Sequence, residues 1–222
     1  MASESPVRIG HCVPDAPDVD VRVDGEIAFE GVAFGDVTDY ANLPSGSHEV
    51  AISAHGETDP VLETTLDLDG ETAYTALATG TLDANDIAAT VMTDAPGKVA
   101  YGMCHGRFVH ASPDAPAVDV RVADGGPTLF ENVGFRTASE YSPVEAATYD
   151  IEVCPTGSDD VALSLPDTRL EGGSAVSAIA VGLVGDMLGQ VLETDSGGVV
   201  VQDIEHQSTA FVAQDSVLFG FG

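Results

Sequence analysis

The strongest constraint on the fold of this chain is that it contains one sequence twice. Residues 11–23 read HCVPDAPDVDVRV and residues 110–122 read HASPDAPAVDVRV, so ten of the thirteen positions are identical. The halves stay in register beyond this motif, because Tyr40 of the first half matches Tyr141 of the second. Self-similarity at this spacing indicates two copies of one domain of ordinary size.

The repeat divides the chain into three parts. We assign the first copy to residues 1–97 and the second to residues 98–196, because turn-forming residues cluster at 94–98. Residues 197–222 have no counterpart in the first copy. In this C-terminal extension, 199–204 and 209–221 are apolar enough to be strands, which we expect either to line the edges of the sandwiches or to pair with a neighbouring molecule.

Within each copy the apolar residues alternate as they do in β-strands. In residues 19–23 the valines alternate with Asp20 and Arg22, which gives one apolar and one charged face. Asp24 and Gly25 then predict a tight turn. The other strands of the first copy are expected at 7–13, 27–34, 47–54, 61–68, 72–82 and 87–93, and the second copy repeats the series. These patterns predict an all-β chain of two tandem immunoglobulin-like antiparallel β-sandwich domains.

The charge balance is extreme. The chain has 37 acidic and 7 basic residues, a formal net charge of -30, and Lys98 is its single lysine. At roughly 1 M salt the Debye length falls to about 3 Å, so neighbouring carboxylates repel one another little. The composition therefore predicts a protein adapted to high salt, of the kind made by salt-loving archaea. It excludes nucleic acid as a partner, because phosphates are bound by clustered Lys and Arg.

Membrane-spanning segments and export signals indicate where a protein acts, and the spacing of its cysteines indicates disulfides or metal sites. No apolar run approaches the roughly 20 residues that span a bilayer, and the N-terminus lacks the pattern of a signal peptide. If Met1 is the native start, the sequence favours the cytoplasm. Cys12, Cys104 and Cys154 are odd in number and lack metal-type spacing, which leaves either one disulfide with a free thiol or three buried thiols.

The repeated motif resembles a known family. Residues 110–120, followed by a Phe-x-x-Val-x-Phe hairpin and a tyrosine, are similar to the family called "domain of unknown function 4397", and the resemblance covers both copies. The first copy departs at Cys12 and Val13, where the family has Ala-Ser. The resemblance implies secretion or attachment to the cell surface, tandem copies, and no established activity or catalytic residues.

Four carboxylates near the first motif are candidate calcium ligands. Asp15, Asp18, Asp20 and Asp24 lie close together in sequence, and oxygen ligands suit Ca²⁺. The second copy has Ala117 in place of Asp18, and the spacing is not that of an EF-hand. We favour the reading in which these residues shape a turn that the two prolines of the motif restrict.

Two further groups are candidates for chemistry. Cys104, His105 and His110 offer thiolate and imidazole ligands for a transition metal. His110, Ser112 and Asp114 offer the residue types of a hydrolase triad. Val13 of the first copy replaces Ser112, whereas the histidine and aspartate remain, so their shared role needs no hydroxyl. We expect a strand histidine that is hydrogen-bonded to its turn.

These observations predict a non-catalytic structural or interaction module. No glycine-rich loop precedes a helix, so no nucleotide cofactor is expected, and no catalytic set recurs in both copies. Expected partners are other surface proteins, or a second copy reached through the C-terminal extension. The alternatives are a protein that holds a small ligand, a sugar or a metal between the repeats, a strand-donating fibre or oligomer subunit, and, least favoured, a hydrolase.

Overall fold

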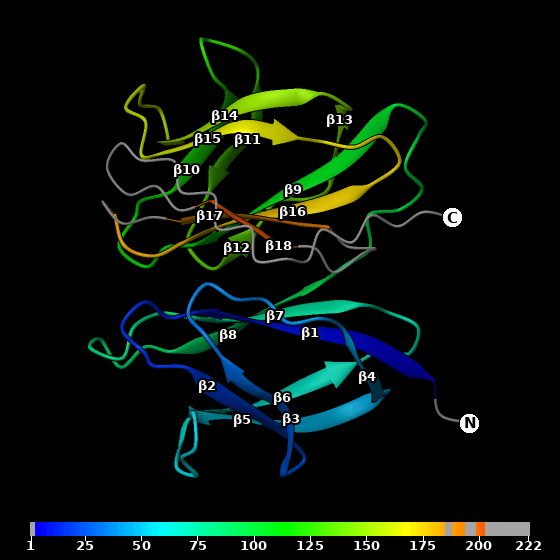
Figure 1. The fold of residues 1–222 in the computed structure, drawn as a ribbon, viewed down its shortest axis with the longest axis vertical. Coiled ribbons are helices and arrows are strands. Elements are labelled where there is room, and N and C mark those ends of the chain that lie inside the picture. Colours follow the sequence, from blue (N-terminus) through cyan, green and yellow to red (C-terminus); the bar gives the residue numbers. More distant parts are fainter. Residues whose placement is uncertain (1–2, 185–187, 194–198, 203–222) are drawn as a thin grey trace. The chain divides into compact units, whose positions relative to one another are not determined.

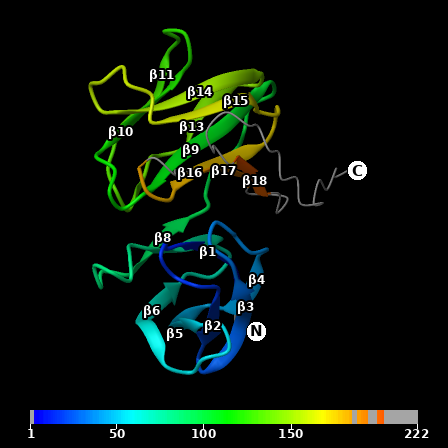
Figure 2. The same ribbon diagram turned by 60° about the vertical axis from the view of Figure 1, so that its left-hand side comes forward.

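The computed structural model describes residues 3–184, 188–193 and 199–202. The chain divides between Ala95 and Pro96 into two compact units, each of which holds one copy of the repeat. Each unit consists of two facing layers of strands joined by turns and loops (Figures 1 and 2). The prediction of an all-β chain of two β-sandwiches is confirmed.

The described residues of the first unit form eight strands in two four-stranded sheets. One sheet has the order β4-β1-β7-β8 and the other has the order β3-β2-β5-β6. The strands are β1 (Glu4–Cys12), β2 (Val19–Val23), β3 (Glu26–Val32), β4 (Ala41–Pro44), β5 (Gly46–Ala54), β6 (Pro60–Leu68), β7 (Tyr74–Thr79) and β8 (Ala88–Thr93).

The second unit repeats this arrangement and extends it. One sheet has the order β11-β10-β14-β15; the other has the order β12-β9-β16-β17-β18, with β13 also paired to β9. The strands are β9 (Met103–Ala111), β10 (Val118–Val122), β11 (Thr128–Val133), β12 (Thr137–Ala138), β13 (Ser142–Glu145), β14 (Thr148–Pro155), β15 (Leu163–Arg169), β16 (Ala175–Val181), β17 (Leu188–Glu193) and β18 (Val199–Gln202).

The first strand of each unit pairs in parallel with a strand from the later part of the same unit. Residues 7–12 of β1 lie beside residues 74–79 of β7, and β9 lies beside β16 in the same way. All other named pairs are antiparallel, so the antiparallel sandwiches that the sequence predicts contain one parallel pair in each unit. The parallel pair ties the beginning of each copy to its end.

Alternating valines and other apolar residues form the core between the two sheets. In the first unit Val7, Ile9, Val21, Ile52 and Tyr74 are buried together, and the second unit has an equivalent cluster around Phe108. Each such side chain contributes about 1.5–3 kcal/mol when it leaves water. The predicted tight turn at Asp24 and Gly25 is present, because both residues have positive φ angles, 51° and 85°.

The sequence pattern missed the shortest strands and misjudged some ends. It did not predict β4, β12 or β13, which have two to four residues and so show too little alternation to be recognised. Strand β7 is shorter than the predicted 72–82 because Gly80, with φ 109°, turns the chain away from the sheet. Strand β1 begins at Glu4, three residues earlier than expected.

Strand β18 lies in the described part of the C-terminal extension. Strand β18 pairs antiparallel with β17, with Val199 opposite Leu192, and so forms an outer strand of its sheet. It falls within the segment 199–204 that we expected to be a strand, whereas 209–221 lies outside the described residues. No described segment is a helix that could cross a membrane.

Candidate functional site

The histidine of the repeated motif fastens the turn that follows its strand. The amide of Val13 donates to Nδ1 of His11 at 3.3 Å, and Nε2 lies 3.0 Å from the carbonyl oxygen of Pro17. Since Nδ1 accepts, the proton sits on Nε2, which donates to the carbonyl. Burial lowers the pKa of His11, in keeping with this neutral form.

The second copy repeats these two hydrogen bonds. Ser112 N–H donates to Nδ1 of His110 at 3.3 Å, and Nε2 lies 2.9 Å from the Pro116 carbonyl oxygen. Burial lowers the pKa of His110 as well. Both ring nitrogens are therefore used by the backbone of the same turn, which leaves neither to act on a substrate.

The first aspartate of the motif joins this turn to a second turn, the one that follows the parallel-paired strand β7 or β16. Asp15 accepts hydrogen bonds from the amides of Leu82 and Asp83, each at 2.8 Å, in the turn between β7 and β8. In the second unit Asp114 accepts from the amide of Val184 at 2.8 Å. These carboxylates hold two turns together within each sandwich.

The second of the two aspartates that both copies share binds amides of β3 and of the turn that follows β5. Asp20 accepts from the amides of Gly31 and Gly56 and lies 2.8 Å from Nδ1 of His55. The Gly56 amide is the largest cause that lowers the pKa of Asp20, to about 2, and the His55 and Gly31 hydrogen bonds add to it. This aspartate stays ionised because the backbone surrounds it with donors.

In the second unit Asp119 has the same role. It accepts from the amides of Asn132 and Gly157, and from Thr156 Oγ1 where the first unit has a histidine. Asn132 has φ 51° and Gly31 has φ 63°, a left-handed conformation that glycine and asparagine tolerate best. The motif thus specifies the same backbone geometry in both units.

The three residues that suggested a hydrolase triad have different partners. Ser112 Oγ donates to the carbonyl of Gly182 at 2.6 Å rather than to His110, and Asp114 binds the Val184 amide. His110 binds the backbone of its own turn. The three side chains are therefore not linked as nucleophile, base and orienting acid.

The four aspartates proposed for calcium are also engaged separately. Asp24 binds His48 and the amide of Glu49, while Asp15 and Asp20 bind the backbone groups named above. Asp18 is exposed, and its main-chain oxygen accepts from the His55 amide. Within the described ranges, no three His, Cys, Asp or Glu side chains are arranged to hold a metal ion.

The three candidate transition-metal ligands, Cys104, His105 and His110, have separate partners as well. Cys104 is fully buried and accepts from Ser174 Oγ at 3.4 Å, and His105 Nδ1 lies 2.7 Å from the Pro96 carbonyl oxygen. All three cysteines of the chain are free and buried. Burial raises the pKa of the Cys12 thiol to about 12, which makes it a poor ligand or nucleophile.

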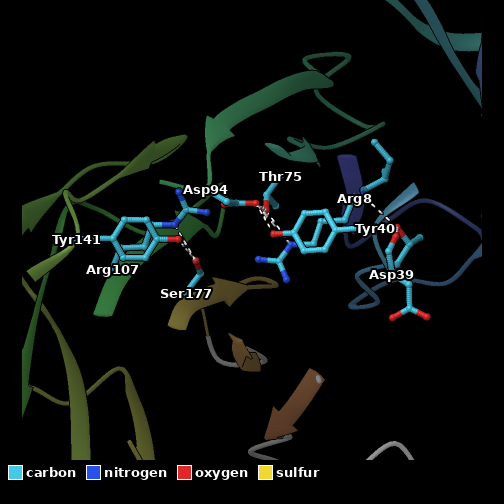
Figure 3. Close-up of polar contacts among 10 residues, drawn as sticks. Arg8, Asp39, Tyr40, Thr75, Asp94, Arg107, Tyr141 and Ser177 are labelled. Carbon is cyan, nitrogen blue, oxygen red and sulfur yellow. Dashed lines mark hydrogen bonds and ion pairs between the residues drawn. The ribbon is translucent and has the colours of Figure 1, made fainter. Parts of the chain in front are cut away.

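A buried arginine cluster lies on the sheet face opposite the core in the first unit (Figure 3). Arg8 is 2% exposed, and its Nε donates to Thr75 Oγ1 at 2.8 Å, while its guanidinium lies 4.7 Å from the centre of the Tyr40 ring. Thr75 and Tyr40 both donate to Asp94 Oδ2, at 2.6 Å each, and Arg8 Nε is 3.9 Å from that oxygen. Burial, and then the hydrogen bond to Asp94, raise the pKa of Tyr40.

The second unit builds the cluster with related residues (Figure 3). Arg107 Nε donates to Ser177 Oγ at 2.7 Å, and the guanidinium lies 4.7 Å from the Tyr141 ring centre. Sequence reasoning missed both clusters. The signal was present, because each arginine stands three residues before a motif histidine in a chain that has only seven basic residues.

Comparison with known proteins identifies the family. The model of the "Domain of unknown function (DUF4397)" matches residues 5–121 and 107–203. The chain belongs to this family. The two overlapping matches agree with two tandem DUF4397 copies, as the repeated motif predicted. No curated protein matches the chain.

Two solved structures share a distant likeness with this DUF4397 protein. One is the carbohydrate-binding module CBMbc of family CBM26 from Eubacterium rectale Amy13K in complex with maltoheptaose, at 10% identity and TM-score 0.27, covering 93% of this chain and 100% of that one. The other is a fimbrial assembly protein from Parabacteroides distasonis, at 9% identity and TM-score 0.28, covering 90% and 99%. At these scores neither likeness carries an argument about function.

One histidine outside the motif distinguishes the two DUF4397 units. In the first unit His48 lies between two acceptors, with Nδ1 2.7 Å from Asp24 Oδ2 and Nε2 2.7 Å from the Pro44 carbonyl oxygen. Both ring nitrogens face oxygen acceptors, an arrangement that favours the imidazolium form, in which both donate. The hydrogen bond to Asp24, and then that to Pro44, raise the pKa of His48.

The second unit has no histidine–carboxylate pair at this place. Tyr149 replaces His48, and its hydroxyl donates to the Glu145 carbonyl at 2.9 Å, the counterpart of the Pro44 contact. The position of Asp24 is held by Ala123, whose amide makes the same main-chain bond. The carboxylate and its histidine are therefore present together or absent together.

We expect His48 to make the first unit less stable in alkaline solution. Because its pKa is raised on folding, the stabilisation is complete below the unfolded value of about 6.5 and is lost as pH rises through the folded value. The variant His48→Tyr should flatten this dependence. The measurement is the melting temperature of the first unit between about pH 6 and pH 9 at constant high salt. The hydrogen bond to Asp20 also raises the pKa of His55, so part of the pH dependence should remain in the His48→Tyr variant. A melting temperature that depends on pH equally in the parent and in His48→Tyr would contradict the role of His48.

Replacing a motif histidine should weaken its sandwich. His11→Ala or His110→Ala removes two hydrogen bonds and leaves a buried amide without its partner, so we expect a loss of about 1–3 kcal/mol in the free energy of unfolding. Denaturant titration followed by circular dichroism measures it. Tyr101→Ala, at a fully exposed ring, is the control and should change little.

Proposed function

We propose that this DUF4397 chain is a non-catalytic structural or interaction module that acts outside the cell in a salt-rich environment. The observation that carries this proposal is the identical use of the repeated polar residues in both units. His11 and His110 bind the backbone of their own turns, and Asp20 and Asp119 bind bulge and hairpin amides. These residues recur because the fold needs them, and none is left over for a reaction.

The composition supports the proposed habitat. With 37 acidic and 7 basic residues, one-to-one pairing of every cation would still leave 37 − 7 = 30 carboxylates on the chain. Such a surface stays hydrated and soluble where salt is concentrated. The resemblance of the motif to its family supports export or attachment to the cell surface.

The location is tested by labelling cells of the source organism. An antibody against the chain should bind intact cells kept in their growth salt, and permeabilising the cells should add little signal. A cytoplasmic protein detected in parallel shows that the intact cells are closed. Labelling that appears only after permeabilisation would reject an extracellular role.

The interaction role is tested by adding purified protein back. Lys98 is exposed and is the single lysine, so an amine-reactive dye marks the chain there and at its N-terminus. Cells that lack the gene should bind the dyed protein in a saturable way, and unlabelled protein should compete. Binding that rises linearly without saturation would count against an interaction module.

A further inference from the structure

Strand β8 is an edge strand without the usual protection against pairing. It ends the sheet β4-β1-β7-β8, and no strand in the described part of the first unit pairs with its outer edge. Its sequence, AATVMT, has no charge, proline or glycine. Its register with β7 runs without a shift from Tyr74 opposite Thr93 to Thr79 opposite Ala88. A regular, uncharged edge of this kind readily accepts another strand.

The other edge strands of the same unit are protected. Strand β4 has four residues and ends at Pro44. Strand β3 carries register shifts in its pairing with β2, and Glu26 and Glu30 lie along it. Strand β6 begins with Pro60 and carries Glu63 and Asp67. Short length, proline, bulges and charge are the devices that prevent edge-to-edge pairing, and β8 has none of them.

An apolar recess lies beside this edge, between the two sheets. It has a volume of about 30 Å³ and is lined by Ala89 and Val91 of β8 and by Thr64 and Leu66 of β6, among others. Val91 lines the recess and is still 44% exposed. Side chains of an added strand that point inward would cover Val91 here.

The second unit shows that a strand fits at the equivalent edge. Strand β17 is the counterpart of β8, and β18 lies along it in antiparallel register, with Gly189 opposite Gln202 and Leu192 opposite Val199. The first copy has no sequence that corresponds to β18. The edge geometry that the two units share therefore receives a strand in one unit and pairs with no named strand in the described part of the other.

We propose that β8 receives residues 209–221 of a second copy of this chain as an added strand. This proposal rests on the interaction role proposed above and names its partner. Twenty residues follow β18, and 209–221 contains three phenylalanines and a single charge, Asp215. A nearly uncharged donor meets an uncharged acceptor, whereas most of this acidic surface would repel a strand of its own kind.

The length of the donor favours it over self-pairing of β8. A stable interface buries about 1,200–2,000 Å² in total, which favours the longer donor over a second copy of the six-residue β8. Thirteen residues with large side chains add contacts along β8 and into the recess. Donor and acceptor are different parts of the chain, so each copy can donate to the next and form a ring or a filament.

Sedimentation of the full chain in about 1 M salt tests the proposal. The mass should rise with protein concentration, and removal of residues 203–222 should leave single chains. Val91→Glu should weaken association by about tenfold or more, because it buries a carboxylate under the added strand. Val61→Glu, which places the same charge on β6 at similar exposure (47%), should leave association unchanged.

A second donor variant guards against effects of truncation. Leu218→Asp places a charge in the donor segment, should weaken association as truncation does, and should leave the circular dichroism spectrum unchanged. A full chain that is monomeric at every concentration would overturn the proposal. Association that survives truncation would also overturn it, and would point to direct pairing of β8 with β8 if Val91→Glu abolished it. Neither result would affect the location of the protein on the cell.

Discussion

Dialysis from about 1 M to about 0.1 M salt is expected to unfold the protein. The Debye length grows from about 3 Å to about 10 Å over this range, so carboxylates that hardly interact at high salt repel their neighbours at low salt. With a net charge of -30 the repulsion summed over the chain competes with a folding free energy of only about 5–15 kcal/mol. Loss of the β-sheet circular dichroism signal measures the transition.

A charge-reversal variant separates screening from other effects of salt. Asp59, Glu63 and Asp67 are exposed on or beside β6, and replacing all three by lysine makes the net charge less negative by six. We expect this variant to unfold at a lower salt concentration than the parent. Sucrose at equal osmolarity should not replace the salt. A spectrum unchanged by desalting would reject salt adaptation.

The second large effect is expected at the buried arginine of the first unit. Asp94→Asn removes the carboxylate beside Arg8 while the guanidinium stays buried, and breaking a buried pair in this way costs about 3–5 kcal/mol. The first unit should then melt well below the second, which keeps its own arginine cluster. Differential scanning calorimetry in high salt would show one transition shifted and one in place. Asp67→Asn, on exposed β6, is the control and should shift neither.

A double-mutant cycle shows how much of this cost belongs to the pair. Arg8→Leu with Asp94→Leu replaces both charges by apolar groups, and such a replacement is often close to neutral in stability. We expect the double variant to be more stable than either Arg8→Leu or Asp94→Leu alone. Thr75→Ser should be tolerated, because Ser177 makes the equivalent bond in the second unit. Strictly additive losses would show that Arg8 and Asp94 do not stabilise each other.

Most of the fold could be predicted because residues that are close together in the sequence determine each strand and turn. The valines of β2 alternate with polar residues, and Asp24 with Gly25 sets the turn, so strand, face and turn are all encoded within seven residues. The parallel pairing of β1 with β7 could not be predicted in this way. It joins residues 67 positions apart, such as Arg8 and Thr75, and no local pattern records which strands become neighbours.

The candidate site was predictable only where two copies could be compared. Replacement of Ser112 by Val13 showed that the shared histidine needs no hydroxyl, and the structure places that histidine in a hydrogen-bonded turn. The Arg8 cluster was missed because its residues come from four separate segments. An arginine in an alternating strand is typical of a solvent-facing position, and its burial depends on tertiary neighbours that the pattern does not show.

The parallel pair of β1 with β7 also sets the order in which the chain can fold during synthesis. Strand β1 waits for Tyr74–Thr79 to leave the ribosome, which takes several seconds at roughly 5–20 residues per second. Strand β9 resembles β1 and would compete with it for β7, but Met103–Ala111 emerges only after the first unit has all its strands. Translation from the N-terminus therefore lets the first sandwich close before its rival exists, an advantage that refolding from denaturant does not offer.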